Sequence, residues 1–192
     1  SMNNKSLGRT LSRRKILKTA AIAGAGMALP WPVLAQSRLV DTQGLQLYSL
    51  RQEMGADFEG TLAKLAEIGF KEMEFAGYFD KTPSQVRSIL DANGLTSPAA
   101  HIPLEAIRDN LNKVIDTAAT IGQKYIVLPY MVGADREYDN YARIADLLNH
   151  AGEAGKNAGI KMGYHNHDFE FDKHDGRMGY DVLLEQTDDD LV

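Results

Sequence analysis

Residues 160–171 of the chain read Ile160-Lys161-Met162-Gly163-Tyr164-His165-Asn166-His167-Asp168-Phe169-Glu170-Phe171. The run 160–164 is typical of a strand, and the next seven residues hold two of the chain's five histidines and two carboxylates. Because alternate residues of a strand share a face, we expect His165 and His167 to point the same way and Asn166 and Asp168 the other way. Two imidazoles this close can bind one divalent cation, whereas exposed polar residues at a strand end are the other interpretation. The rest of the chain decides between them.

Glycines divide the chain into repeated units. Gly69, Gly94, Gly122 and Gly159 each follow a helical pattern and precede a strand-like run, as left-handed glycines at helix ends do. They are 25, 28 and 37 residues apart, which is the length of one helix plus one strand. The spacing therefore predicts alternating strands and helices.

Apolar residues recur at helical spacing between these glycines, and we expect them to form the core. The four stripes are Phe58, Leu62, Leu65 and Ile68; Val86, Ile89 and Leu90; Leu104, Ile107, Leu111, Val114, Ile115 and Ala118; and Tyr141, Ile144, Leu147 and Leu148. Strands are expected at 45–49, 72–75, 96–101, 125–129 and 160–165. A helix is expected at 180–185, and a sixth strand begins at 191–192.

Strands that alternate with helices form a parallel sheet, either doubly wound or closed into a barrel. No G-x-G-x-x-G follows the first strand, which argues against a dinucleotide-binding fold. Polar residues at or just after the carboxyl ends of the strands favour a (β/α)8 TIM barrel, which builds its site on that face. These residues are Tyr48, Arg51, Glu74, His101, Tyr130, His165 and His167.

A TIM barrel typically needs about 250 residues, and the sequence reaches only its sixth strand within 192 residues. We therefore predict an α/β fold that is a TIM barrel truncated after about five and a half units. Such a sheet has two open edges, so we expect a partner chain, misassembly or a longer native protein. A homo-oligomer is compatible with this expectation.

Residues 1–35 differ from the rest of the chain, because they carry six Lys and Arg and no acid, then an apolar stretch at 19–29. The small-residue site Val33-Leu34-Ala35 completes the pattern of a signal peptide. The segment Ser12-Arg13-Arg14-Lys15-Ile16-Leu17-Lys18 resembles the twin-arginine export signal, with Ile16 where Phe is usual. An apolar stretch of about 11 residues is shorter than the roughly 20 of a membrane span, so no stable membrane anchor is expected. We predict a signal peptide at 1–35, a barrel part at 36–192 and a periplasmic protein.

The composition limits the ligands. Without its first 35 residues the chain keeps 15 Lys and Arg against 26 Asp and Glu, a net charge of −11. This charge and the lack of a basic stripe argue against a nucleic-acid partner, which needs clustered Lys and Arg, and favour small neutral or sugar-like ligands. The chain has no cysteine, so any metal is held by nitrogen and oxygen ligands.

The sequence resembles the xylose isomerase-like TIM-barrel superfamily, and more narrowly its exported members labelled sugar phosphate isomerase/epimerase. The likeness covers residues 45–192. It rests on the segments Leu45-Gln46-Leu47-Tyr48-Ser49-Leu50-Arg51, Gly69-Phe70-Lys71-Glu72-Met73-Glu74-Phe75, Ala100-His101 and Tyr164-His165-Asn166-His167-Asp168-Phe169-Glu170-Phe171.

This resemblance implies a small-molecule carbohydrate substrate and proton abstraction next to one of its carbonyl or hydroxyl groups. It also implies a divalent metal (Mn, Mg, Zn or Co) held by residues from strands five to eight. Members commonly carry a Glu, both ligand and base, where this sequence has His165. The base must then come from elsewhere, and the ligands of strands six to eight are expected after residue 192.

The candidate site residues follow from position and chemistry. His165 is the first choice as metal ligand, since neutral imidazole suits these metals. Glu170 is a second ligand if its segment folds back over the mouth of the barrel. Otherwise Glu170 is a solvated acid in a loop. Glu74, His101 and His167 are the catalytic candidates. His101 contacts substrate, shuttles a proton or is structural, and Glu74 must be paired if buried. His167 ligates metal or binds a hydroxyl group. The substrate-binding candidates are Tyr48, Arg51, Tyr130 and Phe169.

We therefore expect the full-length protein to be a metal-dependent sugar isomerase or epimerase. A lyase that acts on oxidised (keto) glycosides would use the same metal and base. A non-catalytic periplasmic protein that binds carbohydrate through its histidines is a third interpretation. The net charge argues against an AP endonuclease, which shares this barrel but needs a groove that neutralises phosphates.

Overall fold

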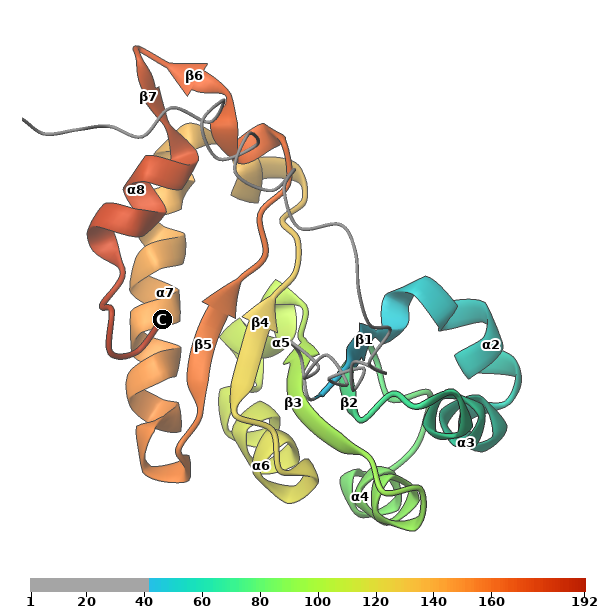
Figure 1. Ribbon diagram of the computed structural model, residues 1–192. Helices are drawn as coiled ribbons and strands as arrows, with labels where there is room; N and C mark the ends of the chain where they lie inside the picture. The colour runs from blue at the N-terminus through green and yellow to red at the C-terminus, as the bar shows by residue number, and fades with distance from the viewer. Residues whose placement is uncertain (1–41) are drawn as a thin grey trace, which may run out of the picture. The chain divides into compact units, whose positions relative to one another are not determined.

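The computed structural model describes residues 42–192 (Figure 1). The predicted signal peptide at 1–35 lies outside the described residues. None of the helices in the described part is long and apolar enough to cross a membrane.

Five parallel strands form one sheet in the order β1-β2-β3-β4-β5. Their bounds are β1 Gly44–Gln46, β2 Glu72–Phe75, β3 Thr96–His101, β4 Tyr125–Leu128 and β5 Lys161–Tyr164. Each strand pairs with the next one along the chain, whereas a doubly wound sheet reverses its order at a switch point. The sequential order is that of a barrel wall, as the polar strand ends predict.

Helices connect the strands and line one face of the curved sheet (Figure 1). The α-helices are α2 Arg51–Ala56, α3 Phe58–Ile68, α4 Pro83–Ala92, α5 Leu104–Asp109, α6 Leu111–Ile121, α7 Tyr141–Gly155 and α8 Gly179–Gln186. The 3-10 helices are η1 Leu47–Leu50, η2 Gly133–Arg136, η3 Tyr138–Asn140, η4 Lys156–Ala158 and η5 Phe169–Phe171. A short hairpin of β6 Lys173–His174 and β7 Arg177–Met178 precedes α8.

The main core lies between the sheet and the helices. Along β2 the side chains alternate, so that Met73 and Phe75 are buried in the core while Glu72 and Glu74 lie on the other face. The predicted helical stripes supply most of the remaining core. Ile68 is an exception, because it is 64% exposed at the last turn of α3, and its assignment to the core is wrong.

The predicted helix ends are confirmed. Gly69 and Gly122 adopt the left-handed conformation, with φ of 114° and 90°. The N–H of Gly69 donates to the carbonyls of Leu65 and Ala66, which α3 leaves without partners at its end. This geometry turns the chain from each helix back into the sheet.

Several strand bounds differ from the sequence prediction: β4 ends at residue 128 rather than 129, and β5 spans 161–164 rather than 160–165. β1 ends at Gln46 rather than at residue 49, because Gln46 caps the 3-10 helix η1. Residues 191 and 192 do not form a strand, although the N–H of Met162 donates to the Leu191 carbonyl at 2.9 Å. The chain therefore runs beside β5 where a sixth strand was expected.

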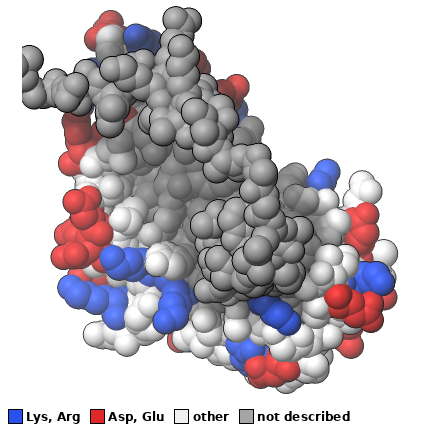
Figure 2. Space-filling model, in the orientation of Figure 1, with Lys and Arg blue, Asp and Glu red and all other residues white. Residues whose placement is uncertain are grey.

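The surface carries both charges. On the face shown in Figure 2, Lys and Arg lie among Asp and Glu rather than forming one continuous basic stripe. Exposed pairs such as Lys64–Glu67 and Lys81–Glu59 account for part of this mixture.

Candidate functional site

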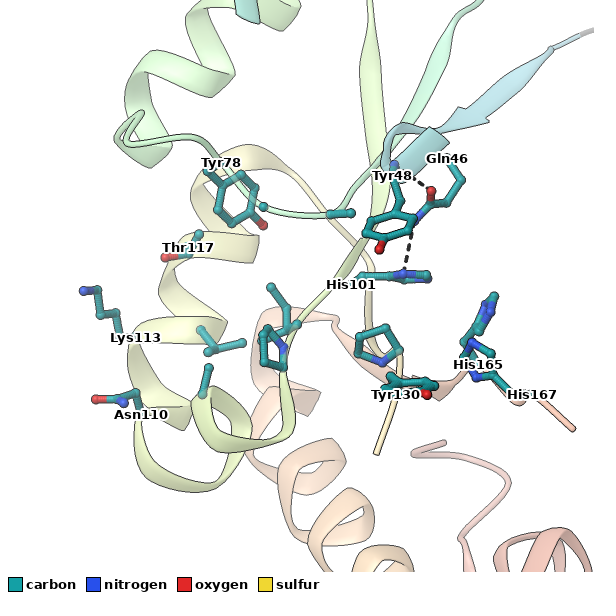
Figure 3. Close-up of a pocket in the computed structure, with 17 residues that line it drawn as sticks. Gln46, Tyr48, Tyr78, His101, Asn110, Lys113, Thr117, Tyr130, His165 and His167 are labelled. Carbon is teal, nitrogen blue, oxygen red and sulfur yellow. Dashed lines mark hydrogen bonds between the residues drawn. The ribbon is translucent and has the colours of Figure 1, made fainter. Parts of the chain in front are cut away.

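A pocket of about 1080 Å³ opens at the carboxyl ends of the strands (Figure 3). Its lining includes residues that follow or end all five strands, among them Gln46, Tyr48, His101, Tyr130, His165 and His167. A second part of the lining is mostly apolar and includes Tyr78, Ile102, Pro103 and Val114. The carboxyl ends of parallel strands thus bring together side chains that are far apart in sequence, as in other barrels.

Gln46, Glu74 and His101 form a hydrogen-bonded chain across β1, β2 and β3. The Gln46 amide nitrogen lies 3.1 Å from Nδ1 of His101, and Nε2 of His101 lies 3.0 Å from a Glu74 oxygen. Gln46 and Glu74 are register partners in the parallel sheet, which explains their proximity. The Glu74 side chain is 28% exposed, so it is partly buried and paired, as its position in a strand required.

His165 and His167 lie on the same side of the loop after β5. Their ring centroids are 5.0 Å apart, which confirms the predicted shared face. The His165 ring is also 5.0 Å from the His101 ring. Partial burial, and then the charges of the two neighbouring histidines, lower the pKa of His165 below 6.5. Its imidazole is therefore neutral at pH 7, which is the form that binds metal.

Glu170 is fully buried beneath this loop. One carboxylate oxygen accepts a hydrogen bond from the Tyr164 hydroxyl at 2.6 Å, and the other accepts from the backbone N–H of His167 at 2.7 Å. Burial, and then the hydrogen bond to Glu170, raise the pKa of Tyr164 far above its usual range, so its hydroxyl stays a donor. The alternative of a solvated loop acid is wrong. As a metal ligand, Glu170 stays a prediction and would have to release one of these two donors.

Aromatic rings and one arginine hold the wall beside His167. The Tyr130 ring meets the His167 ring edge-on, with 4.7 Å between centroids, and the Phe169 ring stacks on the His167 ring with 5.9 Å between centroids. The Arg136 guanidinium lies 4.3 Å from the Tyr130 centroid and 4.2 Å from that of Phe169. Arg136 also donates to the Met131 carbonyl at 2.6 Å. It thus ties the loop after β4 to the loop after β5.

Tyr48 and Arg51, predicted to bind substrate, lie near each other after β1. Tyr48 lines the pocket and is exposed. The Arg51 guanidinium stacks on the Tyr48 ring at 4.5 Å and donates to the Tyr48 carbonyl at 3.0 Å, and it is not part of the pocket lining. The structure brings Tyr48, Tyr130 and the three histidines together, while Arg51 supports Tyr48 from outside.

The sequence prediction missed Gln46, Tyr164 and Arg136. Gln46 and Tyr164 lie within the segments that carried the family resemblance, and their position beside the candidate residues was an available signal. Arg136 lies in an irregular segment, η2, and no sequence pattern relates it to Tyr130 or Phe169. Its contacts arise only from the packing of two loops.

The imidazoles of His165 and His167 suit one side of a divalent metal site, because both are nitrogen ligands and His165 is neutral. Nδ1 of His167 is buried and has no hydrogen-bond partner among the described residues. Within residues 42–192 no group of three or more His, Asp or Glu side chains is arranged to hold a metal. The residues present therefore fit part of a metal site, which needs at least one more ligand.

Comparisons with known proteins agree with this geometry. The model of the family described as xylose isomerase-like TIM barrel matches residues 62–186. No curated protein sequence matches the chain.

Solved structures give the same fold. A sugar phosphate isomerase/epimerase from Parabacteroides distasonis is 24% identical, with a TM-score of 0.68 over 82% of this chain and 68% of the other. A second from the same organism is 26% identical, with a TM-score of 0.61 over 76% of this chain and 64% of the other. A family 2 AP endonuclease from Brucella melitensis is 15% identical, with a TM-score of 0.50 over 56% and 48%. The chain thus spans about two thirds of the length of the first two relatives and has the TIM-barrel fold.

Proposed function

Because the chain belongs to the xylose isomerase-like TIM barrel family, we propose that the protein is a sugar isomerase or epimerase. It acts by removing a carbon-bound proton next to a carbonyl or hydroxyl group of a carbohydrate. The observation that carries the proposal is the Glu74–His101 pair beside His165, at the strand ends where such barrels build their sites. The names of the two Parabacteroides distasonis structures support the same reaction class.

Glu74 is the proposed base. One of its oxygens faces Nε2 of His101, and the other has no hydrogen-bond partner among residues 42–192. Glu74 lies 3.0 Å from His101, whose ring centroid is 5.0 Å from that of His165, so the carboxylate is near the candidate metal ligand. A carboxylate held in one orientation, with one oxygen free, can take a proton from a bound substrate and return it to a neighbouring carbon or to the other face.

His165 and His167 would hold the divalent metal, Mn, Mg, Zn or Co. When bound there, the metal would supply the positive charge that stabilises the negative charge developing on a substrate oxygen. The exposed rings of Tyr48 and Tyr130 form the pocket wall against which a sugar ring would pack. Phe169 and Arg136 keep Tyr130 and His167 in place from behind.

The pocket volume favours one alternative substrate. The pocket volume of about 1080 Å³ is slightly above the usual range for ligand pockets, about 300–1,000 Å³, and the second part of the pocket is lined mostly by apolar residues. A keto glycoside with a second ring would fill more of this space than one monosaccharide. A lyase acting on oxidised glycosides, with Glu74 again as base, is therefore the second candidate function.

Export to the periplasm is also a proposal, and it rests on the sequence of residues 1–35 alone. Fractionation of cells that express the wild type and an Arg13→Lys, Arg14→Lys variant tests it. Loss of the periplasmic fraction in the variant is expected. Equal fractions in both would contradict the proposal.

The catalytic proposal is tested with the whole protein, Mn²⁺, and a panel of aldoses, ketoses and keto glycosides in deuterated water. Proton NMR measures the replacement of the substrate's carbon-bound proton by deuterium, and separates isomers from elimination products. Glu74→Gln should abolish the exchange. Glu72→Gln is the matched control, because Glu72 lies on the same face of the same strand. Exchange that persists in Glu74→Gln would exclude Glu74 as the base, and binding without exchange would identify a non-catalytic carbohydrate-binding protein.

Metal binding is tested separately by isothermal titration with Mn²⁺ and Zn²⁺. His165→Ala should weaken binding strongly, and His150→Ala, on the exposed face of α7, should not. No binding to the wild type, or equal binding to both variants, would refute the metal site.

A further inference from the structure

We propose that Gln46 is a positioning residue that fixes the tautomer of His101, with the ring proton on Nε2 facing Glu74. The assignment follows from the direction of three hydrogen bonds, and its catalytic meaning rests on the proposed function. The role of Gln46 depends on the way β1 and β3 flank β2.

The orientation of the Gln46 amide is set by the backbone. Its oxygen accepts a hydrogen bond at 2.7 Å from the N–H of Tyr48, at the start of η1. A backbone N–H can only donate, so the amide group facing it is the oxygen and the NH2 group points the other way. The usual ambiguity between the two ends of a glutamine amide is therefore removed.

The NH2 group of Gln46 faces Nδ1 of His101 at 3.1 Å (Figure 3). An amide NH2 has no acceptor, so Nδ1 must accept and therefore carries no proton. A proton on Nδ1 would place two N–H donors face to face. The proton of the neutral ring is thus on Nε2, from which it is donated to Glu74 at 3.0 Å.

This chain of bonds runs in one direction, from the Tyr48 N–H through Gln46 and His101 to the Glu74 carboxylate. Each member has one fixed role, and the last one is an acceptor, which is the role of an ionised carboxylate. The groups that face the His101 ring are Gln46, Glu74 and the ring of His165. Both nitrogens of His101 are occupied, so the ring does not itself exchange a proton with substrate. It holds the Glu74 carboxylate in one orientation.

Two-bond nitrogen–proton NMR correlations of the histidine rings test the assignment in the whole, metal-free protein. They report each ring nitrogen through carbon-bound protons, and His101→Asn identifies the signals of His101. The expected result is an unprotonated Nδ1 and a protonated Nε2. A proton on Nδ1, or a mixture of tautomers, in the wild type would overturn the proposal even if Gln46→Glu does not fold.

Gln46→Glu reverses the polarity of the contact. A carboxylate can still accept from the Tyr48 N–H, but it presents an acceptor to Nδ1 of His101, so a proton should appear on that nitrogen. Gln52→Glu is the control, because it adds the same charge on the exposed side of α2. An unprotonated Nδ1 in Gln46→Glu would contradict the assignment.

The same variants test the catalytic meaning. If Gln46 acts through Glu74, kcat should fall about tenfold or more in Gln46→Glu, with KM little changed. This fall would be a part of the rate enhancement of about 10²–10⁴-fold that a general base supplies. A shifted tautomer with unchanged kcat would refute the link between Gln46 and Glu74. If the wild type shows no isomerase, epimerase or lyase activity, the proposed function fails while the NMR result still decides the tautomer.

Discussion

Replacing Tyr164 by Phe tests whether the buried Glu170 carboxylate holds the loop that carries His165 and His167. Glu170 has no exposed surface, and it accepts two hydrogen bonds, from the Tyr164 hydroxyl at 2.6 Å and from the His167 N–H at 2.7 Å. Tyr164→Phe removes the first donor and leaves the ring in place. A hydrogen bond to a charged group contributes about 1.5–3 kcal/mol to stability. We therefore expect the free energy of unfolding to fall by about that amount.

Urea denaturation at pH 7 measures this change as a lower midpoint with an unchanged m-value. Tyr125→Phe is the matched control, because Tyr125 lies on the neighbouring strand β4, is 47% exposed, and its hydroxyl has no hydrogen-bond partner among the described residues. Its substitution should change stability by less than about 0.5 kcal/mol. The difference between the two variants isolates the buried contact from the general effect of losing a hydroxyl.

Glu170→Gln provides a second reading of the same contact. The substitution keeps the shape of the side chain, removes its negative charge, and replaces one oxygen with an NH2 group. That group can donate to the Tyr164 hydroxyl oxygen while the remaining oxygen accepts from the His167 N–H, so both contacts can persist between neutral groups. Because a hydrogen bond to a charged group is stronger than one between neutral groups, we expect Glu170→Gln to lose less stability than Tyr164→Phe. If Tyr164→Phe is as stable as Tyr125→Phe, the carboxylate does not hold the loop and the argument is wrong.

Three further predictions follow from single residues. Burial raises the pKa of Tyr78 from 10.0 to about 12, so its neutral hydroxyl contributes fully to stability below about pH 10 and this contribution is lost as the pH rises toward 12. In urea titrations between pH 9 and 12, the free energy of unfolding should fall by about 2–3 kcal/mol more in the wild type than in Tyr78→Phe. An equal fall in the two proteins would contradict this. The pKa of His165 is lowered first by burial and then by two neighbouring histidines, so NMR titration of the metal-free protein should give a value below 6.5, and a higher one would refute the arrangement of the rings. A Cβ at Gly179 would overlap the Tyr141 ring, so Gly179→Ala should lower the free energy of unfolding, measured by urea denaturation, by about 1–3 kcal/mol. Gly55→Ala is the control, because helix α2 has room for the methyl group there, and it should be neutral or stabilising. Similar effects of the two substitutions would show that the Tyr141 ring can move aside.

The elements of the fold were predictable because their signals are local. Apolar spacing and the glycines at helix ends placed α3 and α6, and two strands, 72–75 and 96–101, agree with β2 and β3 to the residue. The errors are also local in origin. Periodicity assigned Ile68 to the core, but the helix ends there and leaves the side chain at the surface. The predicted first strand is too long, because the hydrogen bond from the Tyr48 N–H to the Gln46 side chain, which ends the strand, depends on side-chain geometry.

The sequence predicted the location of the candidate site but not its hydrogen-bond network. The polar residues at the strand ends identified the mouth of the barrel, and the alternation rule gave the shared face of His165 and His167. Sequence reasoning could not show that Glu170 turns inward to Tyr164, since this depends on the 3-10 turn η5 and on the depth of the loop. Nor could it relate Gln46 to His101, which are 55 residues apart.

The two carboxylates beside the histidines have different surroundings, and this difference bears on the choice of base. Glu170 has both oxygens occupied by donors and no exposed surface, so it would lose hydrogen bonds before it could accept a proton from a substrate. Glu74 has one oxygen held by His101 and the other without a partner among residues 42–192. Under the proposed function, a chain that carries His165 where the family resemblance implies a Glu ligand and base needs a carboxylate elsewhere. The hydrogen bonds favour Glu74 for that role, and the loss of deuterium exchange in Glu74→Gln but not in Glu72→Gln, measured on folded protein, is the result that would establish it.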